Sequence, residues 1–271
     1  SIPLIVYASV STVSVASLFI GSVLPGILLA CAMAVYCLIY GRKHDLPSYR
    51  KSSPREILRA FKNGIWALLM PIIILGGIFG GIFTPTEAAA VSVAYALLVS
   101  GLIYRDLTWK DLPQIFVETS ISTATIMMLV GLSKASSYVV VTSGLPQQML
   151  EFFTSITSSK VVILLLLNLL FLIIGMMEAS AAIIMMTPLL TPLLSVFNID
   201  PLTFGVMMSF NLCIGLVTPP VGLCLLVCNQ IGETSLSRAI RTMIPMLIIS
   251  LVALMLVTFV PQLTQWLPSI L

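Results

Sequence analysis

The chain has 271 residues, of which 59% are hydrophobic and 8% are charged, with a net charge of +3 and a mean hydropathy of +1.12. This composition excludes a soluble domain of this size. Apolar runs recur along nearly the whole length without the two-residue alternation of barrel strands, so the sequence predicts an all-α integral membrane protein.

The N-terminal sequence indicates a short apolar segment over residues 1–10, then a Ser/Thr-rich turn, and then a membrane span from about 23 to 40. The chain starts without Met and without a signal-peptide pattern, so we expect it to be part of a longer protein. A weak echo in proline spacing favours an internal repeat. Residues 1–40 would then be the end of a first repeat, namely the second half of a broken helix and the span after it.

A basic connector follows. Seven of the thirteen Lys and Arg residues lie between Arg42 and Lys62. Cytoplasmic loops of membrane proteins carry such an excess, so residues 41–63 are predicted to face the cytoplasm. Ser53 and Pro54 look like the start of an amphipathic arm helix along the membrane surface, which completes a connector of residues 41–64.

Residues 65–143 are predicted to hold the first spans of a second repeat. One span opens with Thr84 as N-cap, Pro85 at the first helical position and Glu87 three residues after the cap. This is a complete capping box, which gives Glu87 a structural role. A long helix rich in Ser and Thr follows from about 109 to 141.

Residues 144–231 are predicted to form a short interfacial helix, a re-entrant helical hairpin and a discontinuous helix. The first hairpin arm, 161–174, has a length of roughly 21 Å, which is too short for a hydrocarbon core of about 30 Å. The discontinuous helix is broken within "CIGLVTPPVGLCLLV", between half-helices of about 202–216 and 221–231.

The break in the discontinuous helix is a candidate ion site. Pro219 and Pro220 remove two backbone donors, and we expect the nearby carbonyl groups to lack helical partners, which is costly in lipid. A desolvated monovalent cation would satisfy them, and Gly215 and Gly222 would permit a close approach of another backbone. The predicted ligands are Gly175 at the hairpin tip, Gly215, Thr218 and Val221. The alternative is a kinked helix whose carbonyls meet water or hydroxyl groups.

The opposite polarity predicts an anion site nearby. The half-helix from Val221 and the hairpin arm from Ala179 would direct their positive N-termini inward, which suits a substrate carboxylate. Ser180 and Asn211 would add hydrogen bonds. Glu178, a carboxylate at apparent bilayer depth, is either a functional group or the cap of the second arm.

In residues 232–271 the sequence indicates a polar, basic loop on the cytoplasmic side over 232–241, followed by a last membrane span from about 244 to 260. The C-terminus is therefore predicted to lie in the periplasm.

Three stretches resemble a known family: "GIFTPTEAAAVSVAYAL", "GMMEASAAIIMMTPLLTPLL" and "FGVMMSFNLCIGLVTPPVGLCLLV". They are similar to the large membrane (M, DctM-like) subunit of tripartite ATP-independent periplasmic (TRAP) transporters, and the likeness extends over essentially the whole chain. The resemblance implies an inverted-repeat, elevator-type secondary transporter with scaffold and transport domains, of which this chain lacks most of the first repeat.

The resemblance also implies the partners. These are a small membrane (Q-type) subunit, a periplasmic binding protein and an organic acid, either a C4-dicarboxylate or a sialic acid; the bilayer is the surrounding medium and no nucleic acid is expected. Sodium would be the coupling ion and no other cofactor is implied. The location would be the bacterial inner membrane. The family's other sodium site includes a Pro-Pro-Ser break, of which only Ser1 is present here.

Three alternatives to a sodium-coupled transporter are a proton-coupled transporter, an intramembrane enzyme and a channel. A proton-coupled anion transporter of similar architecture would use Glu178 as its proton carrier. An intramembrane enzyme needs paired carboxylates or a buried base, but the four Asp residues and His44 fall in predicted loops or helix ends, so no enzymatic activity is expected. A channel fits a hairpin and a broken helix less well than alternating access does.

Overall fold

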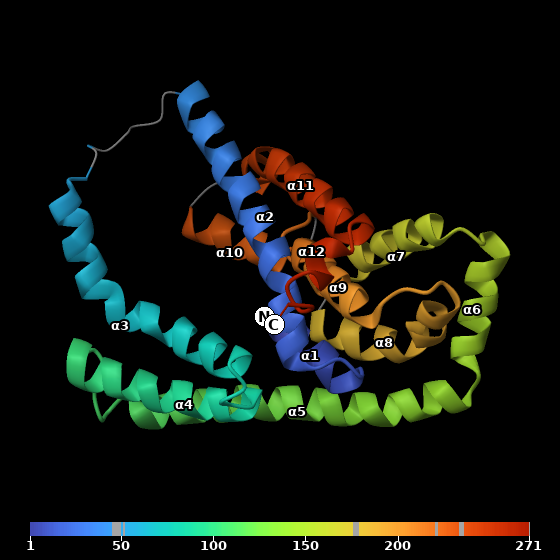
Figure 1. Cartoon of the computed structure of the whole chain (residues 1–271), viewed down its shortest axis with the longest axis horizontal. Helices are drawn as coiled ribbons and strands as arrows, with labels where there is room; N and C mark the ends of the chain where they lie inside the picture. Colours follow the sequence, from blue (N-terminus) through green and yellow to red (C-terminus); the bar gives the residue numbers. More distant parts are fainter. Residues whose placement is uncertain (45–49, 51, 176–178, 220–221, 233–235, 271) are drawn as a thin grey trace. The chain divides into compact units, whose positions relative to one another are not determined.

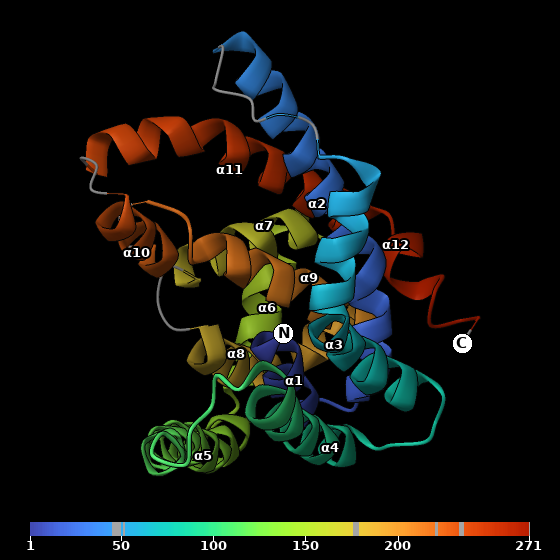
Figure 2. The same ribbon diagram turned by 90° about the vertical axis from the view of Figure 1, so that its left-hand side faces the viewer.

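The computed structural model describes residues 1–44, 50, 52–175, 179–219, 222–232 and 236–270. These residues form helices joined by turns, with no strand among them (Figures 1 and 2). Six helices in the described part are long and apolar enough to cross a membrane: Val15–Lys43, Pro54–Phe79, Pro85–Tyr104, Leu112–Leu132, Ala179–Val196 and Ser237–Phe259. The prediction of an all-α, multi-pass membrane protein is confirmed.

The chain divides into two compact units, one of residues 1–43 and 129–271 and one of residues 44–128. The second unit contains α3 (Pro54–Phe79), α4 (Pro85–Leu98), a π-helical turn (Val99–Tyr104) and the first part of α5 (Leu112–Thr142). Within it, α3 packs against α4, and the Tyr95 hydroxyl donates a hydrogen bond to the Trp66 carbonyl oxygen at 2.7 Å.

The capping box at the start of α4 is confirmed. The Thr84 amide donates to Glu87 Oε2 at 2.8 Å, and the Glu87 amide donates to Thr84 Oγ1 at 3.3 Å, with Pro85 in the first turn. Both groups satisfy amides that a helix start leaves without intrahelical partners. Glu87 thus has the structural role that its spacing predicts.

Three helices are longer than predicted. The arm helix and the following span form a single helix, α3, while α2 (Val15–Lys43) begins eight residues before the predicted span at 23 and α11 (Leu236–Phe259) begins eight residues before 244. Apolar residues mark only the part of a helix that lies in hydrocarbon. A helix continues into polar flanking residues until a cap or a breaker ends it, so the polarity boundary was the wrong criterion.

The larger unit contains the remaining helices. They are α1 (Ile2–Val10), α2, the second part of α5, α6 (Leu145–Ile156), α7 (Lys160–Ile174), α8 (Ala179–Val196), α9 (Pro201–Gly215), α10 (Leu223–Ile231), α11 and α12 (Gln262–Gln265). Helix α9 is at its centre and packs against α1, α2, α7, α8, α11 and α12. Most of its side chains are buried, because it is apolar on every face.

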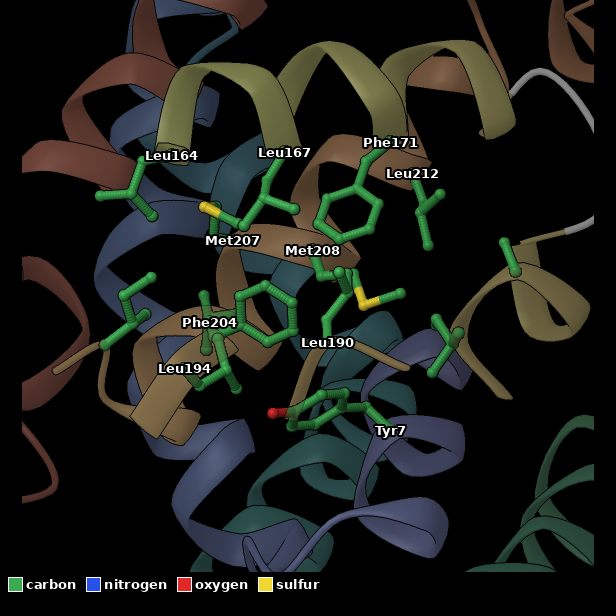
Figure 3. Packing of buried hydrophobic residues seen from close by; sticks show 14 of the residues in the cluster. Tyr7, Leu164, Leu167, Phe171, Leu190, Leu194, Phe204, Met207, Met208 and Leu212 are labelled. Carbon is green, nitrogen blue, oxygen red and sulfur yellow. The ribbon is translucent and has the colours of Figure 1, made fainter. Parts of the chain in front are cut away.

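Aromatic packing fixes α9 between α1 and α7 (Figure 3). The rings of Phe171 and Phe204 meet edge to face with centroids 5.8 Å apart, and the Tyr7 ring lies 6.3 Å from that of Phe204. The Tyr7 hydroxyl donates to the Pro201 carbonyl oxygen at 2.9 Å. Gly205 makes this possible, because a Cβ there would lie 2.3 Å from the Tyr7 ring.

The start of α9 is held by polar contacts. Asp200 caps the helix by accepting from the Thr203 amide at 2.8 Å. The Thr203 hydroxyl lies 2.9 Å from the Thr264 hydroxyl and accepts from Gln265 Nε2 at 3.0 Å. The short helix α12 is thereby tied to the N-terminus of α9, which leaves the opposite end of α9 for the site.

Candidate functional site

The hairpin predicted from the sequence consists of α7 and α8. Their distant ends are linked, because Lys160 Nζ donates to the Asn198 carbonyl oxygen at 2.6 Å. Helix α7 has 15 residues, or about 22 Å, and is too short to be a candidate span, whereas α8 with 18 residues is long enough. The short first arm is therefore confirmed, and the re-entry of the hairpin stays a prediction.

The central feature of the site is a contact between the C-terminal ends of α7 and α9. Gly175 caps α7 and Gly215 is the last residue of α9. A Cβ added to Gly215 would lie 2.4 Å from the carbonyl carbon of Gly175 and 2.5 Å from its oxygen. Only two glycines allow backbones to approach so closely, so the predicted role of Gly215 in backbone contact is confirmed.

The helix is interrupted after Gly215, and α10 starts at Leu223. The carbonyl oxygens near the break were expected to lack helical partners, but three of them accept hydrogen bonds from amides further along the chain and are not left unpaired. Gly215 O accepts from the Thr218 amide at 3.0 Å, Thr218 O from the Gly222 amide at 3.1 Å, and Leu216 O from the Cys224 amide at 3.1 Å. The amides of Thr218, Gly222 and Cys224 therefore replace the helical donors that the prolines remove. Each oxygen retains a second lone pair.

Gly222 has the predicted steric role in this turn. A Cβ at that position would lie 3.0 Å from both the Leu216 and the Thr218 carbonyl oxygens. The Thr218 hydroxyl donates to the Ile214 carbonyl oxygen at 2.8 Å, so its proton is engaged and its lone pairs are available. Pro219 lies in the turn; Pro220 and the predicted ligand Val221 lie outside the described residues.

The electrostatics of the site favour a cation. A helix C-terminus carries about half a negative charge, and two such ends meet where Gly175 touches Gly215. No three His, Cys, Asp or Glu side chains cluster anywhere in the described ranges. The ligands that the turn does offer to a cation are backbone and hydroxyl oxygens, which are hard ligands of the kind that bind alkali-metal ions.

The predicted substrate residues are less closely grouped. Ala179 starts α8 and is buried, and Ser180 beside it is half-buried; Glu178 lies outside the described residues. Asn211 is fully buried in the core, where its Nδ2 donates to the main-chain oxygen and to Oδ1 of Asn168, at 2.8 and 2.9 Å. Substrate binding by these four residues stays a prediction.

Asn168 is the residue that sequence reasoning missed. It lies on α7 within "KVVILLLLNLLFLII" and is 4% exposed. Burying an amide side chain in such an apolar run is costly, so the sequence alone marks Asn168 as unusual. Its partners were not readable from the sequence because they lie on α9 and, through Thr258, on α11.

A second feature absent from the sequence analysis is a pocket of about 670 Å³ in the larger unit. The end of α1, the turn after it, α8 and the loop into α9 line it. Its hydroxyl groups include those of Ser9, Thr187 and Thr191, each of which donates to a carbonyl of its own helix. The pocket therefore presents hydroxyl oxygens as hydrogen-bond acceptors.

These features define a multi-pass helical membrane protein organised around an interrupted helix. The chain belongs to the DctM component family of the tripartite ATP-independent periplasmic transporters, whose model matches residues 1–263. The resemblance seen in the three sequence stretches is confirmed. Because this is a family of transporter permeases, the prediction that the chain is not an enzyme is confirmed as well.

Curated relatives extend over nearly the whole chain. A sialic acid TRAP transporter large permease protein of Vibrio cholerae is 38% identical over 271 residues, covering 100% of this chain and 64% of the relative. A C4-dicarboxylate TRAP transporter large permease protein of Pseudomonas aeruginosa is 38% identical over 99% of this chain and 63% of its own length. A 2,3-diketo-L-gulonate TRAP transporter large permease protein of Escherichia coli is 33% identical over 97% and 62%. The chain spans a little less than two thirds of these relatives.

Proposed function

We propose that this chain forms the ion-binding part of the large permease subunit of a sodium-coupled TRAP transporter, which imports an organic acid across the bacterial inner membrane. The substrates in the names of the relatives, sialic acid, C4-dicarboxylates and 2,3-diketo-L-gulonate, all carry a carboxylate. A carboxylate-bearing substrate is therefore the chemistry that the family membership favours for this chain.

The sodium site would comprise Gly175, Gly215, Thr218 and Val221. The observation that carries this assignment is the contact of two glycine-ended helix C-termini, with a Cβ on Gly215 placed 2.5 Å from the Gly175 carbonyl oxygen. Two negative dipole ends this close repel each other unless a cation lies between or beside them. The spare lone pairs of the turn carbonyls and of the Thr218 hydroxyl supply the remaining oxygen ligands.

The substrate carboxylate would bind where α8 begins. Ala179 and Ser180 are the first residues of this helix, whose N-terminus carries partial positive charge. Glu178 immediately precedes it, and Asn211 would act from α9. Closeness of the carboxylate to the sodium ion would couple the two binding events, since each charge stabilises the other.

The remaining parts of the proposal follow the family. The transport domain would move as an elevator, with the hairpin of α7 and α8 re-entering the membrane. A small membrane subunit would extend the scaffold and a periplasmic binding protein would deliver the substrate. The basic connector 41–63 would face the cytoplasm and the C-terminus the periplasm.

Transport assays test the coupling ion. The permease expressed from its complete gene, with its partner subunits, is reconstituted in proteoliposomes and substrate uptake is measured under a sodium gradient or a pH gradient alone. We expect uptake under the sodium gradient only. Uptake driven by the pH gradient alone would favour proton coupling through Glu178 instead.

Substitution of one ligand tests the site itself. Thr218→Val keeps the side-chain volume and removes the hydroxyl oxygen, so sodium activation should require a higher sodium concentration while the protein remains folded. Unchanged sodium activation in this variant would contradict the assignment of Thr218 as a ligand.

A further inference from the structure

Three buried polar side chains, from three helices, meet one to two turns away from the glycine contact. Asn168 on α7, Asn211 on α9 and Thr258 on α11 are each at most 4% exposed. Asn168 Nδ2 donates to Thr258 Oγ1 at 3.1 Å and to the Leu164 carbonyl oxygen at 2.9 Å. Asn211 Nδ2 donates to both oxygens of Asn168.

The orientation of the Asn211 amide is determined by its surroundings. Both nearby groups on α7 are oxygens, the main-chain oxygen and Oδ1 of Asn168, so the nitrogen of Asn211 must face them. Its own oxygen is buried and has no partner among the described residues. The pair is therefore directional: α9 donates and α7 accepts.

The amide pair and the glycine pair lie on the same faces of the same two helices. Asn211 precedes Gly215 by four residues and Asn168 precedes Gly175 by seven, and residues four or seven apart share a helix face. The distances along the axes are about 6 Å and about 10.5 Å. The bonds between the amides thus act directly on the register in which the two glycines meet.

Directional hydrogen bonds add to apolar packing in setting this register. Around the amides, α7 and α9 present Leu164, Leu167, Phe171, Met207 and Leu212, which restrict the register through their shapes (Figure 3). Apolar cores tolerate alternative packings of similar volume, so shape alone specifies a unique arrangement less strictly. Two hydrogen bonds to defined atoms of Asn168 allow one arrangement only.

We propose that Asn168 and Asn211 are positioning residues that hold the C-terminal ends of α7 and α9 in register, and thereby set the affinity for the coupling cation without contacting it. This inference rests on the sodium site proposed above. It assigns to Asn168 a role whose partners the sequence did not reveal, and it gives Asn211 a role that requires no contact with the substrate.

The test uses the complete permease with its partner subunits. Thermal unfolding is followed while NaCl replaces choline chloride, which gives the sodium concentration of half-maximal stabilisation, and uptake at saturating sodium gives the substrate KM. The double variant Asn168→Leu/Asn211→Leu removes both amides and leaves no orphaned partner between them. We expect its unfolding temperature without sodium to be maintained and its half-saturating sodium concentration to rise about tenfold.

A matched control separates this role from the general loss of a buried hydrogen bond. Thr187 on α8 is 2% exposed, and its hydroxyl donates at 2.7 Å to the Ile183 carbonyl oxygen of its own helix rather than to α7 or α9. Thr187→Val should leave the sodium dependence unchanged. If the double Leu variant does not fold, Thr258→Val tests the positioning role instead, because it removes only one partner of the Asn168 amide. It should raise the half-saturating sodium concentration about twofold to threefold.

The outcomes are distinct. An unchanged sodium dependence in the folded double variant, or in Thr258→Val if the double variant does not fold, overturns the positioning role. A higher substrate KM with unchanged sodium dependence overturns it too and makes Asn211 a direct substrate ligand. If the wild-type protein shows no stabilisation by sodium, the ion site proposed above is wrong, and the positioning role falls with it.

Discussion

Substituting Gly215 by Ala is the most direct perturbation of the ion site, because the structure gives the size of the clash. The added Cβ would lie 2.4 Å from the Gly175 carbonyl carbon, whereas nonbonded carbon atoms stay at about 3.5–4.0 Å. The two backbones must therefore separate by about 1 Å or more. No side-chain rotation can relieve the clash, since the atoms of Gly175 that it meets belong to the main chain.

The cost can be estimated from overpacking of a buried contact, which is about 1–3 kcal/mol. If the separation moves the carbonyl oxygens off their positions around the ion, this energy reduces sodium affinity by about 5-fold to 150-fold. Thermal unfolding at increasing sodium concentration measures the affinity. Gly64→Ala on α3 is the control, because a Cβ there meets nothing within 4 Å.

One result would refute the reasoning. If Gly215→Ala remains folded and its half-saturating sodium concentration equals that of the wild-type protein, the contact between the two helix ends does not form the ion site. The glycines would then serve only to pack α7 against α9.

Three further predictions concern the surrounding structure. Gly205→Ala should lower the free energy of unfolding by about 1–3 kcal/mol, measured by thermal or denaturant unfolding, because the methyl group would displace the Tyr7 ring; full stability would show that α1 moves easily. Thr264→Val should cost about 1 kcal/mol in the same assay, because it removes the contact between the Thr264 and Thr203 hydroxyls. The pKa of Asp111 is lowered, first by the hydrogen bond from the Thr108 hydroxyl and then by that from its amide. The resulting stability is present above the unfolded-state pKa, about 3.9, and is lost as pH falls through the lower folded-state value. Asp111→Asn should therefore flatten this part of the acid unfolding profile; an unchanged profile would show that the Thr108–Asp111 hydrogen bonds do not contribute to stability.

Much of the local structure was readable from the sequence. Continuous apolar runs required helices, because hydrocarbon offers no partner for a free amide or carbonyl. The spacing of Thr84 and Glu87 predicted the capping box, and the double proline predicted the interruption after Gly215. These predictions held because each depends on residues within a few positions of one another.

The candidate site was only partly predictable. The sequence indicated Gly175 and Gly215 as ends of interrupted helices, and the structure brings them together across 40 positions of the chain. The sequence did not indicate that carbonyl oxygens between Gly215 and Thr218 accept from amides further along the chain, because these bonds depend on the tertiary path of the backbone. Val221 and Glu178 lie outside the described residues, so their predicted roles are still predictions.

The sequence by itself determined that the chain is helical, lies in a membrane and is interrupted at one glycine- and proline-rich stretch. Only the tertiary structure decided which helices surround α9 and which of its faces meets α7. Helix α9 is apolar on every side, so its hydrophobic pattern specifies burial but no direction. The direction comes from the fit of Gly205 to Tyr7, of Gly215 to Gly175, and of Asn211 to Asn168, contacts between distant residues that no local pattern encodes.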